Sequence, residues 1–155
     1  MKVAIIMGST SDLEVMSAAF AVLDDFGVEY EKRVISAHRA PRLLADYVSS
    51  AKDRGISLII AGAGGAAHLA GVAAAYTSLP VIGVPISGKA FGGLDALLSM
   101  VQMPSGIPVA TVAVNGSKNA ALLGLQIAAI SDSALSEKLA SFRLKQTQAI
   151  ENTSI

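Results

Sequence analysis

The chain has 155 residues, of which 52% are hydrophobic and 15% are charged, with twelve basic side chains, twelve acidic ones and no cysteine. The length suits one domain over residues 1–155, no apolar run reaches the ~20 residues of a membrane-spanning helix, and no basic run or aromatic platform indicates a nucleic-acid partner. The lack of cysteine excludes disulfides, thiolate catalysis and cysteine metal sites, and it fits a cytoplasmic protein.

Short apolar runs alternate with helical patterns along the chain, which is typical of βα units around a parallel sheet. The first strand is expected over residues 2–7, after which Ser11 and Glu14 form a capping box for a helix that Gly27 ends. Further strands are expected over 28–35, 57–61, 81–84 and 109–114. Further helices are expected over 41–54, 69–76, 94–102 and 119–130, with an amphipathic helix and polar tail over about 133–155.

This order of elements predicts an α/β fold of three layers, a doubly wound, parallel, five-stranded sheet of flavodoxin-like type with a C-terminal helix. In such folds ligands bind beyond the carboxyl ends of the strands, where the strand order reverses. The helix over 119–130 is apolar almost all round, which predicts burial on every side. Because the charged fraction also lies below the ~25% of a typical soluble domain, we expect a homo-oligomer whose contacts cover part of the surface.

Three loops follow predicted strands and carry residues suited to chemistry. In the first, over 8–12, glycine, hydroxyls and a helix N-terminus suit an anion such as phosphate, while Asp12 suits the hydroxyls of a ribose. An ordinary capped turn explains this loop equally well. In the second loop, His38 can give and take a proton near neutral pH, and Arg39 can hold a phosphate or carboxylate. The alternative there is a surface turn with a structural histidine and a solvated arginine.

The third loop, over 62–68, contains three glycines and ends at His68. It lacks the G-x-G-x-x-G spacing of a dinucleotide site, so a backbone lid whose amides line a small pocket is the better interpretation. His68 is either a residue that supports the site or merely the start of a helix. Two histidines without cysteine or an H-E-x-x-H pattern do not indicate a metal site.

Five segments carry a resemblance to a known family: MGSTSD at 7–12, SAHRAP at 36–41, AGAGGAAHL at 61–69, LPVIGVP at 79–85 and GLDALLSMVQMPSGIPV at 93–109. Together they resemble the N5-carboxyaminoimidazole ribonucleotide mutase family, class I of the phosphoribosylaminoimidazole carboxylase catalytic subunit family. The resemblance runs from Lys2 to about Ile130 in order and without large gaps. Five motifs in register make it highly specific.

The resemblance implies an isomerase of purine biosynthesis that converts N5-carboxyaminoimidazole ribonucleotide to 4-carboxy-5-aminoimidazole ribonucleotide. It implies decarboxylation followed by recarboxylation at the ring carbon, with His38 as the acid–base residue and no metal, nucleotide or organic cofactor. It further implies a cytoplasmic homo-octamer with a small ribonucleotide as substrate. The residues that the resemblance assigns to substrate binding or to the pocket lining are Ser9, Asp12, Ser36, Arg39, Ala63 and Gly64.

Some positions depart from the family pattern, and two alternative functions stay open. Ala40 replaces the usual Thr, Ala70 the usual Pro, and 87–92 is atypical, which affects loop rigidity rather than a chemical group. One alternative is a branch that carboxylates aminoimidazole ribonucleotide directly with CO2; it tends to have Lys after the histidine, so Arg39 favours the mutase. The other is a non-catalytic flavodoxin-like domain, for which Asp12 alone poorly matches the acidic cluster of a receiver module.

Overall fold

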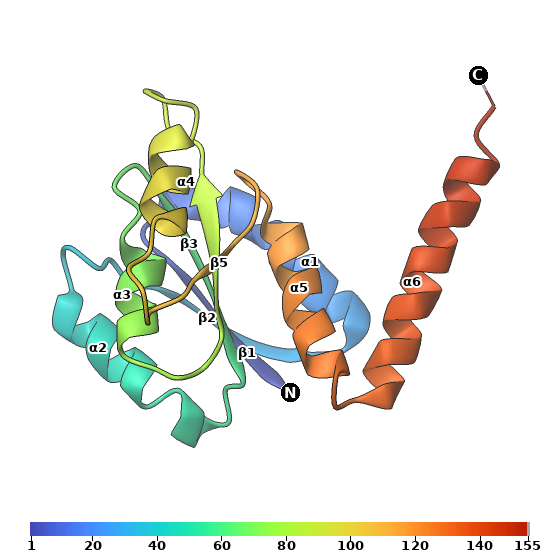
Figure 1. Cartoon of the computed structure of the whole chain (residues 1–155), viewed down its shortest axis with the longest axis horizontal. Coiled ribbons are helices and arrows are strands. Elements are labelled where there is room, and N and C mark those ends of the chain that lie inside the picture. Colours follow the sequence, from blue (N-terminus) through green and yellow to red (C-terminus); the bar gives the residue numbers. More distant parts are fainter. Residues whose placement is uncertain (155) are drawn as a thin grey trace.

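The structure is a computed structural model that describes residues 1–154, and its strands form one sheet (Figure 1). The strands are β1 (Lys2–Met7), β2 (Glu29–Val34), β3 (Leu58–Gly64), β4 (Val81–Ile86) and β5 (Ala110–Thr111). Every neighbouring pair is parallel, and the order is β2-β1-β3-β4-β5. The predicted doubly wound, five-stranded parallel sheet is therefore confirmed. The strand order reverses between β1 and β3, where such folds bind their ligands.

Helices cover both faces of the sheet and give the three predicted layers. One face packs against α1 (Leu13–Phe26) and α5 (Ser117–Ala129), around a cluster of buried apolar residues that includes Met16 and Leu125. The other face packs against α2 (Pro41–Ser49), α3 (Leu69–Ala75) and α4 (Leu94–Val101), around a second such cluster. Each face of the sheet therefore has its own core, as expected for strands that are buried on both sides.

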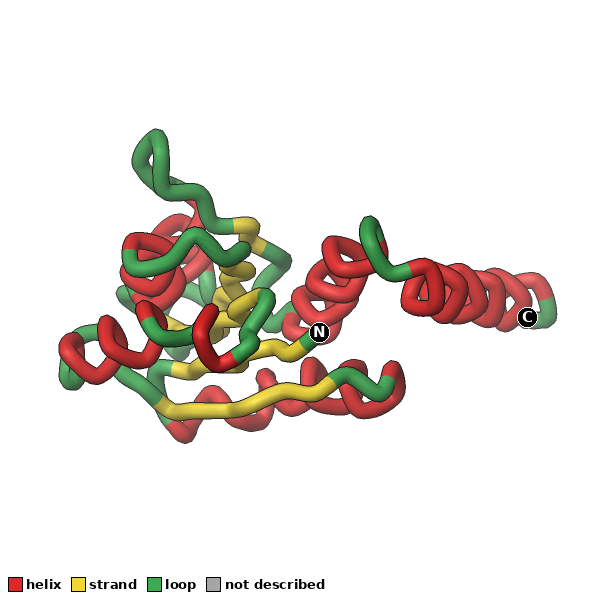
Figure 2. The backbone as a smooth tube through the Cα atoms, turned by 90° about the horizontal axis from the view of Figure 1, so that it is seen from below, coloured by secondary structure: helices red, strands yellow, loops and turns green. Residues whose placement is uncertain are grey.

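The last helix, α6 (Ser133–Glu151), leaves the body of the molecule, as Figures 1 and 2 show from two directions. Its buried residues are Leu135 and Leu139, which pack beside α5, and Lys138 Nζ donates to the Phe26 carbonyl at 3.0 Å. The second half of the helix is mostly exposed, including Ile150 at 76%. No helix within residues 1–154 is both long and apolar enough to cross a membrane.

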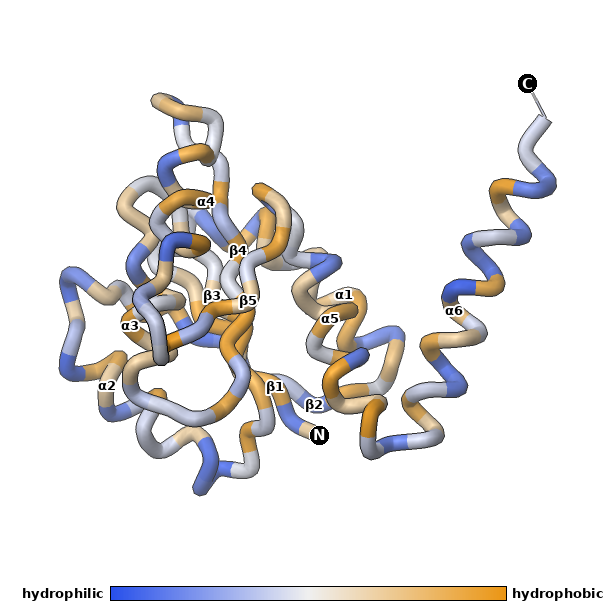
Figure 3. Tube along the Cα trace, in the orientation of Figure 1, coloured by the Kyte–Doolittle hydropathy of each residue, from blue (hydrophilic) through white to orange (hydrophobic). Residues whose placement is uncertain are grey.

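Hydropathy follows the position of each strand in the sheet. The residues of β4 are all buried and those of β3 are buried except Gly64, and Figure 3 shows the more hydrophobic segments gathered at the centre of the molecule. The edge strand β2 is largely charged and exposed, as natural edge strands are. Two glycines permit close helix contacts with the sheet: a Cβ at Gly62 would collide with Met16 of α1, and one at Gly124 would collide with Leu58.

Several predicted boundaries shift. The predicted capping box of Ser11 and Glu14 is wrong, because Ser9 and Asp12 cap a short 3-10 helix, Thr10–Asp12, that precedes α1. The helix predicted over 41–54 is broken into α2 and a 3-10 turn, Lys52–Arg54, which Gly55 ends at a φ of 78°. The strand predicted over 109–114 pairs only at Ala110–Thr111.

The prediction that the helix over 119–130 is buried on every side is wrong for the single chain. One stripe of α5 faces the core of the sheet. On the opposite side α6 covers only part of the helix, so the rest of that side is not fully buried. Leu122, Leu123 and Ile127 are partly buried, and Ile130 at the end of the helix is 87% exposed.

Candidate active site

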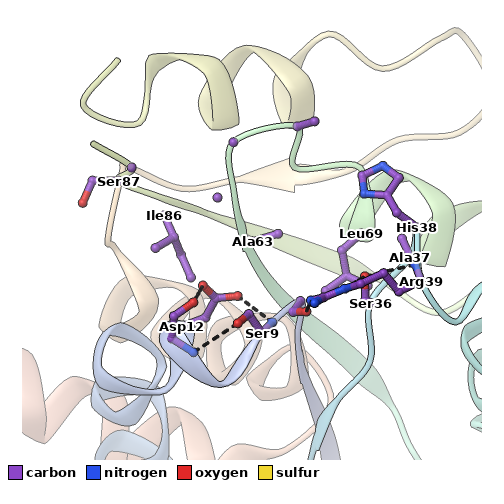
Figure 4. A pocket seen from close by; sticks show the side chains of 16 residues that line it. Ser9, Asp12, Ser36, Ala37, His38, Arg39, Ala63, Leu69, Ile86 and Ser87 are labelled. Atoms are coloured by element: carbon purple, nitrogen blue, oxygen red, sulfur yellow. Dashed lines mark hydrogen bonds between the residues drawn. The ribbon is translucent and has the colours of Figure 1, made fainter. Parts of the chain in front are cut away.

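A cavity of about 490 Å³ lies beyond the carboxyl ends of β1, β3 and β4, at the reversal of strand order. It brings together all three loops that the sequence singles out, and Figure 4 shows their side chains around one hollow. The predicted catalytic residue His38 lines it, and so do all the residues expected to bind substrate or line the pocket: Ser9, Asp12, Ser36, Arg39, Ala63 and Gly64. The remaining lining residues are Gly8, Ser11, Ala37, Gly65, Ala66, Leu69, Ile86, Ser87 and Gly88.

The first loop is held in shape by its own side chains. The Asp12 carboxylate accepts the Ser9 N–H at 3.0 Å, and Ser9 Oγ accepts the Ser11 N–H at 3.3 Å. The backbone N–H groups of Ser9 and Ser11 are therefore already hydrogen-bonded within the loop, as in the capped turn that is the alternative interpretation. The hydroxyl hydrogen of Ser9 remains as a donor at the cavity, whereas the Ser11 hydroxyl donates to Asp12 Oδ1 at 3.3 Å.

Asp12 is buried, with 7% of its surface exposed, and is the only carboxylate among the described residues that line the cavity. Burial raises the pKa of Asp12 above its ordinary 3.8, and the hydrogen bonds from Ser9, Ser11 and Gly8 oppose this rise without cancelling it. A buried carboxylate with free acceptor capacity suits ligand hydroxyl groups, which compensate for the water that burial removes.

The second loop positions Arg39 toward the first. Arg39 Nε donates to Ser36 Oγ at 3.3 Å, and Arg39 Nη2 donates to the Gly8 carbonyl at 3.3 Å. Ser36 Oγ also accepts the Arg39 backbone N–H at 3.2 Å, which fixes the turn before α2 begins at Pro41. In Figure 4 the Arg39 side chain runs from its own turn toward Ser9. Among the described lining residues it is the one permanent cation, placed beside the serine hydroxyls.

His38 lies on the same turn, one residue before Arg39, and its ring is exposed at the edge of the cavity. Its Nε2 lies 2.8 Å from Nδ1 of His68, the residue just before α3. This contact places the ring of His68 beside that of His38, at the edge of the site. His68 does not itself line the cavity.

The third loop contributes backbone and small side chains. Ala63 and Gly64 end β3, and Gly65 turns the chain at a φ of 63°, a conformation that favours glycine. Gly64 also packs closely, because a Cβ there would lie 3.0 Å from the Ile86 carbonyl of β4. This wall of the cavity therefore consists of glycine and alanine residues, whose small size leaves the main chain close to the cavity.

A fourth loop, after β4, was not singled out as a site by the sequence. Ser87 and Gly88 line the cavity, and Asn115 holds Ser87 from a loop 28 residues away. Asn115 Oδ1 accepts the Ser87 N–H at 3.0 Å and Asn115 Nδ2 donates to Ser87 Oγ at 2.9 Å, while Asn115 itself has a φ of 59°. Its position directly after a buried strand could have indicated that it lines the site, but the loop carries no chemical motif.

The described residues, 1–154, contain no cluster of three or more His, Cys, Asp or Glu side chains able to hold a metal ion. The cavity instead combines one exposed cation, one buried carboxylate, serine hydroxyls and the imidazole of His38. This set can bind the phosphate and hydroxyls of a nucleotide and can move a proton, which defines a small-molecule enzyme site on a flavodoxin-like sheet.

The chain belongs to the AIR carboxylase family, which matches residues 2–149. It is 63% identical over 142 residues to the N5-carboxyaminoimidazole ribonucleotide mutase of Pyrococcus abyssi, covering 92% of this chain and 82% of that protein. It is 57% identical over 152 residues to the enzyme of that name from Vibrio parahaemolyticus, covering 97% and 94%. The crystal structure of Treponema denticola PurE superimposes with a TM-score of 0.86 at 31% identity, covering 96% of this chain and 93% of that one.

Proposed function

We propose that the chain is an N5-carboxyaminoimidazole ribonucleotide mutase, an isomerase of purine biosynthesis. The observation that carries this proposal is the identity of 57–63% to relatives of that name over nearly the whole chain. The cavity adds independent support, because it gathers a proton-transfer group, a cation and a buried carboxylate from three separate loops. A ribonucleotide carries a phosphate, ribose hydroxyls and a ring, and each meets a matching group in such a site.

Substrate binding follows from the charges. Arg39, with the Ser9 hydroxyl, holds the 5′-phosphate, since a guanidinium binds phosphate with paired N–H donors. Asp12 accepts hydrogen bonds from the ribose. The aminoimidazole ring then lies against Ala63 and Gly64, where the main chain allows close approach and leaves little room for water. Ser36 acts indirectly, because it orients Arg39.

The chemical step moves one carboxyl group and cycles one proton. The bond from N5 to the carboxyl carbon breaks, its electron pair stays on nitrogen, and His38 gives N5 a proton as CO2 forms. The ring carbon C4 then attacks that CO2, and His38 takes the proton that C4 loses. One proton given and one taken leave the enzyme unchanged, so a single histidine can serve as acid and base. Bound substrate, by filling the cavity, would keep CO2 close to C4 between the two steps.

An isotope experiment tests the function and separates it from its alternatives. The protein is given N5-carboxyaminoimidazole ribonucleotide with a 13C carboxyl group, in unlabelled bicarbonate. A mutase forms the 4-carboxy product with 13C retained. A direct carboxylase forms product from aminoimidazole ribonucleotide and incorporates the unlabelled carbon. A binding domain forms no product above the uncatalysed rate, which would overturn the proposal.

Assembly belongs to the same proposal. The exposed apolar residues Ile130 (87%), Ile150 (76%) and Leu144 (57%) lie at the end of α5 and on α6, the helix that leaves the body of the chain. A projecting helix with so few contacts of its own is stabilised when a second copy packs against it. The family resemblance implies an octamer, and we adopt this as the expected assembly.

A further inference from the structure

The only side-chain hydrogen bond of the His68 ring within residues 1–154 is with the ring of His38. The two rings meet edge to face, at 74°, with centroids 4.9 Å apart and Nε2 of His38 2.8 Å from Nδ1 of His68. We propose that His68 is a positioning residue: its Nδ1 accepts the Nε2–H of His38, which leaves Nδ1 of His38 as the nitrogen that exchanges protons with the substrate. The inference rests on the proposed function, because it concerns the same proton transfer.

The first argument is the place of each ring. His38 lines the cavity, whereas His68 does not. A nitrogen that is already hydrogen-bonded to His68 is not available to a substrate. The Nδ1 of His38 has no hydrogen-bond partner within residues 1–154, so it is the nitrogen that a ligand in the cavity can use.

The second argument is the number of hydrogens. The 2.8 Å contact holds one hydrogen, so one ring donates and the other accepts. If His68 accepts, the bond is the same whether His38 is neutral or cationic, because Nε2 carries hydrogen in both forms. If His68 donated instead, protonation of His38 at Nε2 would place two N–H groups against each other. Only the first arrangement lets His38 pass through acid and base forms without a rearrangement of its neighbour.

The third argument is rigidity. His38 lies on an exposed turn, and no other hydrogen bond within residues 1–154 orients its ring. The backbone of His68 is fixed on both sides, since its N–H donates to Ala66 and its carbonyl accepts the Val72 N–H of α3, at 2.8 and 2.9 Å. Its neighbours Ala67 and Leu69 are buried. His68 therefore provides a fixed acceptor that selects one tautomer and one orientation of His38, as the groups behind other active-site histidines do.

The test uses two variants of His68. His68→Asn places an amide oxygen near the position of Nδ1 and keeps an acceptor, whereas His68→Phe keeps a ring without one. Because the side chain is exposed, both variants are expected to fold. We expect His68→Phe to lower single-turnover rates by about 10–100-fold, the usual effect of losing an orienting partner, with product affinity unchanged. His68→Asn should recover most of that rate.

A spectroscopic measurement reads the tautomer directly. The chain has only two histidines, so solid-state 15N spectra of protein labelled at histidine contain four ring nitrogens. At a pH where both rings are neutral, we expect Nε2–H and bare Nδ1 on both rings of the wild type. In His68→Phe the remaining His38 ring should become a mixture of tautomers, which a purely structural role of His68 would not produce.

The outcomes separate this inference from the proposed function. A protonated Nδ1 on neutral His38, or wild-type turnover in His68→Phe, overturns the role of His68 and leaves the mutase intact. Equal loss of rate in His68→Asn and His68→Phe also overturns it, since an acceptor at that position would then make no difference. A wild-type protein that forms no product overturns the mutase, while the 15N spectra still decide which ring donates.

Discussion

Asp12 accepts the backbone N–H of Ser9 at 3.0 Å, so the one buried carboxylate of the site also fixes the loop that contains the proposed phosphate contact. Because Ser11 in turn donates its N–H to Ser9 Oγ, the loop is already shaped before any ligand arrives. The side chain of Ser9 therefore has two roles, since its oxygen accepts within the loop while its hydroxyl hydrogen is free for a ligand. Binding at this loop requires little ordering, which favours affinity.

The first prediction concerns the charge of Asp12. Asp12→Asn keeps an oxygen that can accept the Ser9 N–H but removes the negative charge that suits ribose hydroxyls. Hydrogen bonds to a charged group contribute about 1.5–3 kcal/mol, so product affinity should fall by about 10-fold or more. A calorimetric titration measures this, and a 2′,3′-dideoxy analogue serves as control because it should bind both proteins alike. If Asp12→Asn weakened binding of the analogue as much as binding of the product, the proposed contact with the ribose would be wrong.

The same substitution is predicted not to lower stability. Burial raises the pKa of Asp12, so the folded protein holds a proton at pH values where the unfolded chain has already lost it. Protonated Asp12 therefore adds to the free energy of unfolding at low pH, and this contribution is lost as pH rises from the ordinary value of 3.8 through the raised pKa. At neutral pH the charged carboxylate is therefore a cost to the fold, and Asp12→Asn should unfold in urea at an equal or higher concentration than wild type. A clearly lower midpoint would mean that the charge itself holds the loop.

The second prediction concerns Arg39. Arg39→Ala should weaken binding of the ribonucleotide product by about 1.5–3 kcal/mol, the range for a charged hydrogen bond. The dephosphorylated nucleoside should bind wild type and variant equally. Arg39→Lys keeps the charge but loses the paired donors, so its affinity for the ribonucleotide should lie between those of wild type and Arg39→Ala. If the variant lost nucleoside affinity as well, Arg39 would be holding the turn with Ser36 rather than the phosphate.

The third prediction concerns His38. His38→Asn preserves approximate shape and some hydrogen bonding but cannot carry a proton between N5 and C4. Single-turnover rates should fall by at least ~10²–10⁴-fold, the usual contribution of general acid–base catalysis. Product binding, measured by titration, should stay close to that of wild type. A loss of affinity that matches the loss of rate would indicate a binding role instead.

Much of this site could be predicted because strands and their loops are encoded locally. β1 begins and ends at the predicted residues, 2–7, and the sheet order places the three predicted loops at one edge. The sequence pattern places the capping box two residues too late, because Ser9 with Asp12 and Ser11 with Glu14 give the same pattern and only the three-dimensional turn selects the first pair. The pairs Ser87–Asn115 and His38–His68 could not be predicted, since each joins loops about thirty residues apart whose meeting depends on the whole sheet.

The fourth prediction concerns assembly. Ile130 is 87% exposed, so Ile130→Glu should leave the fold of the single chain unchanged. If copies of the chain cover this end of α5, the variant buries an unpaired carboxylate in the interface. The mass of the assembly, measured by light scattering, should then shift from that of an octamer toward smaller species. Ile130→Val keeps an apolar side chain and should assemble as wild type. A wild-type chain that is monomeric at micromolar concentration would contradict the proposed assembly.

The last prediction concerns acid stability and a network away from the site. Glu31 on β2 accepts the Tyr47 hydroxyl at 2.8 Å and Arg54 Nη2 at 3.1 Å, which ties the edge strand to the segment around α2. Burial by itself would raise the pKa of Glu31, but Tyr47 and Arg54, with a smaller effect of Lys2, outweigh it and lower the pKa below 4.5. Burial and the Glu31 carboxylate raise the pKa of Tyr47, so Tyr47 stays a donor at neutral pH.

A lowered carboxyl pKa fixes the direction of the pH effect. The stability that charged Glu31 provides is fully present above the ordinary value of 4.5 and is lost as pH falls through the lowered pKa. Glu31→Gln should therefore lower the free energy of unfolding by about 1–3 kcal/mol at pH 7, and the difference from wild type should shrink as pH falls below 4.5. Urea unfolding at fixed protein concentration measures both. Glu29→Gln is the matched control, because Glu29 bonds to the same Lys2 but is 72% exposed and should cost little. A difference that stays constant from pH 7 to acid would show that the charge of Glu31 contributes nothing.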